Sequence, residues 1–309
     1  GGATTLTVTN AVSLSGASVL LAQGKNARTA SAGTGVTIHA GSMSIDTGSK
    51  LSADAQGYSG GYSGVWGGFG PGGAGAYYDA GGGGGHGGVG GYGANWGNSP
   101  GGGAYDTQYQ PTALGSGGGA NYNNTGGGRG GYGGGSITLT VANQLLLDGE
   151  ISARGENATN VDQGGGAGGS LWITTGTLAG SGAFNADGGA GGSRYGGGGG
   201  GGRIALYYYD TLGGFDASRI TVAGAPGAMY NPLFIYGGVG GRIAVYYAAD
   251  AGFTGFTASS ASGGSAGIVP GQTGTTGFFD MGAGHPDLKV YQNFVLEAAT
   301  TVTYDTITV

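Results

Sequence analysis

The chain has 309 residues, of which 83 are glycine, none is cysteine and only 8% are charged. Seven prolines are too few for collagen, and an apolar share of 38% with 19 tyrosines argues against a wholly disordered chain. Without cysteine there are no disulfides and no thiolate chemistry, and a net charge of −6 without a Lys/Arg cluster gives no electrostatic footprint for nucleic acid or an anionic membrane.

The composition also bears on location. A chain poor in Lys and rich in Gly, Thr, Ser, Asn and Tyr is typical of a bacterial secreted or surface protein, so we expect an extracellular location. Because the chain begins Gly1-Gly2 rather than with Met, we expect a processed or excerpted segment. No apolar stretch approaches the ~18 residues of a membrane-spanning helix, so no membrane span is expected.

The N-terminal part predicts short β-strands. Apolar and polar residues alternate with a period of two, as they do in half-buried strands, and no helical period extends over a helical length. So much glycine would also make a helix costly, at about 1 kcal/mol per glycine. Short strands are expected around Leu6/Val8, Val12/Leu14 and Val19/Leu21, and then at residues 36–38 and 51–53.

A glycine-rich tract follows, over residues 57–135. In parts of it, pairs of glycines separate single larger residues. In a helix with three residues per turn, such as polyproline II, these larger residues would all lie on one edge. Bare glycine edges let neighbouring segments approach closely enough to hydrogen-bond. The residues at every third position are His86, Val89 and Tyr92 in 84–93, and Arg129 and Tyr132 in 127–134.

A flexible linker is the alternative interpretation of this tract. Linkers seldom carry many aromatic residues, and this tract is rich in tyrosine and contains two tryptophans, so we expect it to be ordered when packed on the rest of the chain. Trp66, Tyr92 and Trp96 could stack on the rings of an external glycan, or they could pack between glycine segments.

Four later segments begin alike, with glycine followed by a short apolar strand. Their first apolar residues, Ile137, Leu171, Ile204 and Ile243, are 34, 33 and 39 positions apart. A repeat of this length without a helix is expected to be a coil of strands, and stacked coils would bury these four side chains in one column. Each is followed after 13 to 16 residues by a second strand, at 151–153, 184–186, 220–222 and 256–258.

We therefore expect an all-β protein, a parallel β-helix (solenoid) with an inserted polyglycine-II-like bundle. Residues 1–56 would form the first coils, residues 57–135 the insertion, and residues 136–309 further coils of the same solenoid. A β-sandwich with coincidental internal similarity is the alternative fold.

Two segments carry a resemblance: Gly-Gly-Arg-Ile-Ala-Leu-Tyr-Tyr at 201–208 and Gly-Gly-Arg-Ile-Ala-Val-Tyr-Tyr at 240–247. They resemble the glycine-rich β-helical repeats of very large bacterial secreted and surface proteins, over about two thirds of the chain. The tract resembles the polyglycine-II layers of an insect antifreeze protein and of some phage tip adhesins. The resemblance implies adhesion, surface layers or filaments as functions.

Catalytic and metal-binding patterns are not found. The three histidines, His39, His86 and His285, lie far apart, without zinc-ligand spacing. The carboxylates are scattered, and no Gly-x-Ser-x-Gly elbow occurs in a strand-to-helix setting, although a Ser/His/Asp arrangement assembled by folding stays open. We expect no enzyme activity, no cofactor and no metal.

The two ends of the chain read as one pattern. Residues 301–309 followed by residues 1–10 would continue the alternation of short strands, so the ends are interpreted as two halves of one solenoid. The prediction is a self-assembling structural subunit that joins other copies head to tail; the alternatives are an adhesin for a glycan, a surface or ice, and ends that are only domain boundaries. The residues expected at this seam are Leu6, Val8, Val302, Ile307 and Val309.

Overall fold

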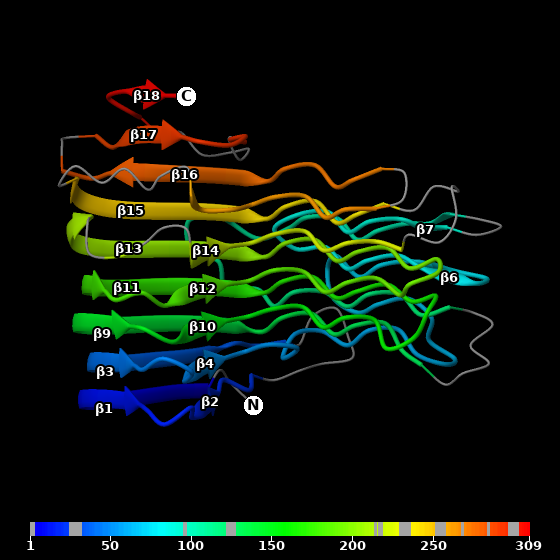
Figure 1. The fold of residues 1–309 in the computed structure, drawn as a ribbon, viewed down its shortest axis with the longest axis horizontal. Coiled ribbons are helices and arrows are strands. Elements are labelled where there is room, and N and C mark those ends of the chain that lie inside the picture. The colour runs from blue at the N-terminus through cyan, green and yellow to red at the C-terminus, as the bar shows by residue number, and fades with distance from the viewer. Residues whose placement is uncertain are drawn as a thin grey trace.

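The computed structural model describes residues 4–24, 33–94, 98–121, 128–212, 215, 219–228, 236–250, 258–266, 269–282, 285–295 and 303–309. Over these residues the protein is all-β, without an α-helix, and its sheets are mostly parallel. Figure 1 shows the strands stacked at one side of the molecule and long glycine-rich segments extending to the other side.

The larger sheet has nine strands within the described residues. Its strands run parallel from β1 through β16, whereas β17 is antiparallel to β16 and β18 is parallel to β17. Their order is β1 (Thr4–Leu14), β3 (Val36–Ile45), β9 (Ser136–Leu147), β11 (Ser170–Ala179), β13 (Arg203–Leu212), β15 (Arg242–Asp250), β16 (Thr275–Asp280), β17 (Asp287–Val290) and β18 (Ile307–Thr308).

A second, parallel sheet is built from the short strands that follow the long ones. Its order is β2 (Val19–Leu21), β4 (Lys50–Ser52), β10 (Glu150–Ser152), β12 (Ala183–Asn185) and β14 (Ile220–Thr221). Two small antiparallel pairs lie in the glycine-rich tract: β5 (Ala76–Tyr77) with β6 (Ala80–Gly81), and β7 (Gly93–Ala94) with β8 (Asn98–Ser99).

The strand register confirms the predicted alignment of the repeats. Ile137 pairs with Leu171, Leu171 with Ile204, and Ile204 with Ile243, and all four side chains are buried. The second strands align in the same way, through Leu51, Ile151, Phe184 and Ile220. The strand expected at 256–258 falls largely outside the described residues.

The two sheets enclose one hydrophobic core, because side chains at alternate positions of both point toward each other. Each fully buried Leu, Ile or Phe side chain contributes about 1.5–3 kcal/mol relative to an exposed one. Apolar residues at every second position of successive repeats therefore hold the stack together, although no single repeat could bury its own apolar face.

The N-terminal strand corrects one expectation. Leu6/Val8 and Val12/Leu14 were expected in two short strands, but both pairs belong to β1, a single strand of 11 residues. The register between β1 and β3 shifts after Val8, and similar shifts occur in the middle of other long strands. Such a bulge bends a strand and changes its side-chain phase, so the alternation looks interrupted in the sequence.

The glycine-rich segments hydrogen-bond with a period of three. Residues 164–169 donate their backbone N–H groups in turn to three neighbouring segments, and every third donor returns to the same neighbour. Residues 164 and 167 donate to Gly119 and Ser116, residues 165 and 168 to Gly197 and Gly200, and residues 166 and 169 to Glu156 and Ala153. Residues 197–202 repeat this scheme with the segments at 81–84, 236–239 and 186–189.

Glycine is required where these segments touch. A Cβ atom built on Gly164 would overlap the backbone carbonyl of Gly82, and one on Gly199 would overlap that of Gly166. The bundle includes glycine segments from the repeats as well as from the tract at 57–135, which the sequence interpretation had treated as the only source. The described part of the tract is packed and hydrogen-bonded to those repeat segments.

Candidate functional site

The residues predicted for self-assembly lie at opposite ends of the stack. Leu6 and Val8 are on β1, one edge of the nine-stranded sheet, whereas Ile307 is on β18, the other edge. Leu6 is 39% exposed, Ile307 56% and Val309 96%, while Val8 is half-buried. Val302 falls outside the described residues.

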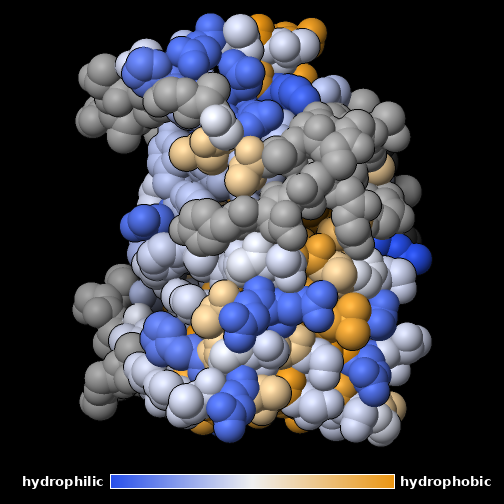
Figure 2. Space-filling view, turned by 90° about the vertical axis from the view of Figure 1, so that its left-hand side faces the viewer, coloured by the Kyte–Doolittle hydropathy of each residue, from blue (hydrophilic) through white to orange (hydrophobic). Residues whose placement is uncertain are grey.

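Among the described residues, the β1 end of the stack leaves both sheets with an unpaired edge. β1 is the outermost strand of the larger sheet and β2 that of the smaller one. Val19 and Leu21 of β2 are 60% and 50% exposed. Figure 2 shows hydrophobic residues at the lower end of the molecule, where β1 and β2 lie, and again near the upper end. Unpaired N–H and C=O groups beside apolar side chains are suited to pairing with another strand.

Of the residues considered for glycan stacking, Trp66 and Tyr92 lie in the described part of the chain. Trp66 is half-buried and accepts a backbone hydrogen bond from Ala120. Tyr92 is partly exposed and its ring lies 5.3 Å from that of Tyr236. Trp96 falls outside the described residues.

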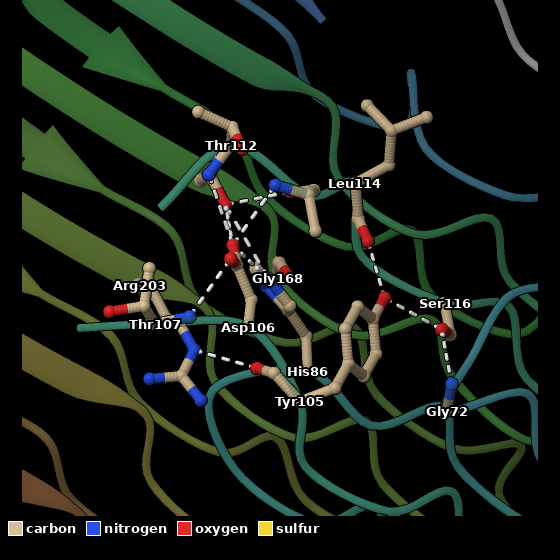
Figure 3. A network of polar contacts seen from close by, with 12 residues as sticks. Gly72, His86, Tyr105, Asp106, Thr107, Thr112, Leu114, Ser116, Gly168 and Arg203 are labelled. Carbon is tan, nitrogen blue, oxygen red and sulfur yellow. Dashed lines mark hydrogen bonds and ion pairs between the residues drawn. The ribbon is translucent and has the colours of Figure 1, made fainter. Parts of the chain in front are cut away.

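A buried polar cluster was not predicted from the sequence. It joins His86, Tyr105 and Asp106 of the glycine-rich tract to Arg203, the first residue of β13 (Figure 3). It also includes Ser170, the first residue of β11. Sequence reasoning noted His86 for its period of three and as one of three histidines without zinc-ligand spacing. Ser170 and Arg203 stand directly before the buried column, and that shared position was the one available signal.

Asp106 organises the tract side of the cluster. Its Oδ1 accepts a hydrogen bond from the backbone N–H of Thr107 at 2.8 Å, and its Oδ2 accepts from those of Thr112 and Ala113 at 3.0 and 2.9 Å. These bonds close the loop between Asp106 and Ala113. The carboxylate thus shapes a segment that contains little regular secondary structure.

His86 and Arg203 connect this loop to the repeats. His86 is fully buried and its Nδ1 lies 2.9 Å from the carbonyl oxygen of Gly168, which can only accept, so Nδ1 carries a hydrogen. Arg203 is almost fully buried and donates through Nε to the carbonyl oxygen of Tyr105 at 2.8 Å. The Ser170 hydroxyl donates to the carbonyl oxygen of Ala113 at 2.7 Å.

Tyr105 extends the cluster. Its hydroxyl donates to the carbonyl oxygen of Leu114 and lies 2.8 Å from Ser116 Oγ, which accepts from the N–H of Gly72 at 3.0 Å. Its ring centroid is 4.8 Å from that of His86. The cluster therefore links three separate parts of the tract to the strands.

Burial sets the protonation of these groups. It lowers the pKa of His86 below the ordinary value of 6.5. The positive charge of Arg203 also lowers this pKa, and the opposing effect of Asp106 does not offset the two. Burial alone would raise the pKa of Asp106, but the nearby His86 side chain and the hydrogen bonds from the backbone N–H groups of Ala113 and Thr107 outweigh it, and the pKa is lowered. Burial raises the pKa of Tyr105. Near neutral pH the cluster therefore holds a neutral imidazole beside a carboxylate and a guanidinium.

The cluster contains serine, histidine and aspartate, but not in the geometry of a catalytic triad. A triad needs the aspartate on Nδ1 and the serine on Nε2. Here Asp106 Oδ2 and Ser170 Oγ both lie 3.5 Å from the same nitrogen, Nε2, and Nδ1 is bound to Gly168. Ser170 is also fully buried and its hydroxyl donates to a carbonyl. This arrangement fastens the tract to the strands.

Aromatic side chains cover another part of the outer face of the larger sheet. The rings of Tyr207 and Tyr246 stack with centroids 4.2 Å apart, and those of Tyr246 and Phe279 at 4.4 Å. Tyr109 of the tract contacts this row, and the Tyr207 hydroxyl donates to its carbonyl oxygen. The rings of this row therefore pack between the tract and the sheet.

No group of three or more His, Asp or Glu side chains that could hold a metal ion occurs among the described residues. Over the same residues, no helix is long and apolar enough to cross a membrane. No protein-family model, curated protein or solved structure matches the chain significantly.

Proposed function

We propose that the chain is an extracellular structural protein, a glycine-rich β-solenoid with a polyglycine-II-like bundle, whose copies join head to tail in a filament or surface layer. The parallel stacking of repeats and the three-residue hydrogen-bond period of the glycine segments support this architecture. In this proposal the chain has no catalytic function, and it uses neither cofactor nor metal.

The observation that carries the proposal is the double edge at β1 and β2. Both sheets end there together, beside the exposed side chains of Leu6, Val19 and Leu21. At ~25 cal/mol per Å² of apolar area, covering a few such side chains contributes several kcal/mol before the costs of association. A contact between two different ends does not close on itself, so it extends into a filament.

The strand directions define what this contact would look like. Because β17 reverses direction and β18 runs parallel to it, β18 runs opposite to β1. A head-to-tail contact would thus pair β18 of one copy antiparallel to β1 of the next. As β18 spans two residues and β1 spans 11, the exposed side chains of Ile307 and Val309 would have to add to the backbone pairing.

Sedimentation of edge variants tests the proposal. Replacing Leu6 and Leu21 together with Lys places two charges at the β1/β2 edge and should abolish concentration-dependent association, with the β-signal in circular dichroism retained. Val161→Lys alters an equally exposed valine in the glycine-rich region and serves as the control. A wild-type chain that stays monomeric up to millimolar concentration, or an edge variant that associates as the wild type does, would contradict the proposal.

An adhesin or binding module is the second candidate, favoured by the partly exposed ring of Tyr92 beside Tyr236. Aromatic faces of this kind can stack on sugar rings. If this function holds, Tyr92→Ala should weaken retention of the chain on immobilised polysaccharide at least tenfold. Equal retention of the two proteins would remove the observation that favours it.

A further inference from the structure

Two glycine segments carry their side chains in step at the surface of the bundle. The N–H of Val239 donates to the carbonyl oxygen of Val89, and the N–H of Tyr236 donates to that of Tyr92. Glycine occupies the two positions between these residues in both segments, so a side chain recurs at every third position of each. The contact joins the tract at 57–135 to the glycine segment that leads into β15.

The tyrosine pair of this contact is both close and accessible. The ring centroids of Tyr92 and Tyr236 are 5.3 Å apart, and the rings are tilted by 56°. Tyr92 is 41% exposed and Tyr236 is half-buried, so a reagent in solution reaches the pair. Because the two residues lie far apart in the sequence, a bond between them would close a long loop of the chain.

Two other tyrosine pairs among the described residues each lack one of these properties. Tyr207 and Tyr246 stack with centroids 4.2 Å apart, but Tyr246 is buried. Tyr77 and Tyr78 are exposed and in contact, but they are consecutive in the sequence. A bond between them would therefore constrain one turn and nothing beyond it.

We infer that Tyr92 and Tyr236 form a site of oxidative coupling into dityrosine, which locks the tract to the repeat segment after folding. The oxidant is hydrogen peroxide acting through a haem peroxidase. One hydrogen atom leaves each phenol hydroxyl, and the two phenoxyl radicals form a carbon–carbon bond between the carbons ortho to their oxygens. The hydrogen on each of these carbons then moves to the phenol oxygen. The net reaction removes two hydrogen atoms and reduces one peroxide molecule to two water molecules.

A covalent bond at this position would hold segments that lack another kind of cross-link. The chain has no cysteine, so disulfides cannot join the glycine segments. The segments touch through their backbones, since a Cβ atom on Gly91 would overlap the carbonyl oxygen of Tyr236. A bond at the surface joins them without a side chain inside the bundle. Both tyrosines belong to one chain, so the inference does not depend on head-to-tail assembly.

Peroxidase treatment of the full chain tests the inference. The chain is diluted until it is monomeric, treated with hydrogen peroxide and a haem peroxidase, digested and mapped by mass spectrometry. We expect dityrosine fluorescence and a cross-linked peptide pair that contains Tyr92 and Tyr236. Tyr92→Phe and Tyr236→Phe keep the aromatic rings but lack the phenol hydroxyl, so each should lose this cross-link. Amide hydrogen exchange at residues 89–92 should slow about tenfold in the treated wild type.

Tyr77→Phe is the matched control, because it removes a phenol of similar exposure outside the pair, and it should keep the cross-link. Thermal unfolding of the untreated variants, unchanged from the wild type, shows that a lost cross-link is not a lost fold. The inference is overturned if the treated monomer contains no dityrosine, if the cross-links join other tyrosines, if Tyr92→Phe keeps the cross-link, or if coupling leaves amide exchange unchanged.

Discussion

Single residues matter most where the register of the sheet makes them neighbours. Ile204 pairs with Leu171 on one side and Ile243 on the other, and its side chain is fully buried. Ile204→Asp would place an unpaired charge in this column, and we expect a loss of about 4 kcal/mol or more, enough to unfold a marginal domain. Thermal unfolding followed by circular dichroism measures the loss.

Thr140→Asp is the control for that variant, because Thr140 lies in β9, two strands away in the same sheet, at a half-exposed position. It should shift stability by little. Equal melting temperatures for Ile204→Asp and the wild type would show that the column is not part of the folded core.

The buried histidine predicts a pH dependence. Because the pKa of His86 is lowered in the folded chain from 6.5, the unfolded chain binds more protons as the pH falls below about 6.5. Stability should therefore decline on acidification through this range, and the lowered pKa of Asp106 adds a further loss toward pH 3. Chemical denaturation at a series of pH values between 8 and 4 measures this slope.

Replacing His86 with Gln removes the titrating group, so the slope between about pH 6.5 and 5 should become shallower. His285→Gln alters an exposed histidine, paired with Asp305, and should keep the wild-type slope. If His86→Gln and the wild type lose stability in parallel, the cluster does not set the acid sensitivity.

Part of this residue-level account was predictable. The buried column followed from a period of two within strands and a repeat of about 34 residues between them. The polar cluster did not, because its members, at positions 86, 106, 170 and 203, are brought together only by folding of the tract over the sheet. Their residue types are ordinary in isolation, and no local pattern joins them.

At the scale of elements, the glycine segments pack so closely that there is no room for side chains between them. Gly88 and Gly130 each lie so close to a neighbouring carbonyl, of Val239 and Gly118 respectively, that an added Cβ atom would overlap it. Gly88→Val or Gly130→Val should therefore separate neighbouring segments and increase amide hydrogen exchange throughout the tract. The valine side chain would also break the hydrogen bonds that follow the period of three.

Gly103→Val is a matched control, since a Cβ atom at Gly103 would meet nothing within 4 Å. It should leave exchange nearly unchanged. Equal exchange in the Gly130 and Gly103 variants would indicate a flexible linker rather than a packed bundle.

Two features of the elements could not be predicted from the sequence: the continuity of β1 and the glycine segments that lie outside the tract. Periodicity located the strands, but the bulge in β1 divided one strand into two apparent ones. The glycine period was recognised only in the tract, because the repeat segments at 164–169 and 197–202 carry too few side chains to mark it. Hydrogen bonding, which leaves no trace in composition, unites them in one bundle.

At the scale of the whole molecule, the two ends of the stack differ. The β1 end repeats the parallel pattern up to its last strand, whereas the other end reverses direction at β17 and packs Leu288 and Val290 with Phe279. From the sequence, the two ends of the chain were interpreted as two halves of one solenoid. The reversal was not predictable, because alternation specifies a strand but not its direction.

Electron microscopy of the negatively stained chain tests head-to-tail assembly most directly. The account predicts filaments whose axial repeat equals the height of one stack, from β1 to β18. Removing residues 303–309, which include β18, should abolish the filaments while the β-signal of the central repeats persists. Filaments of the same axial repeat from the shortened chain, or only monodisperse particles from the intact chain, would contradict the account.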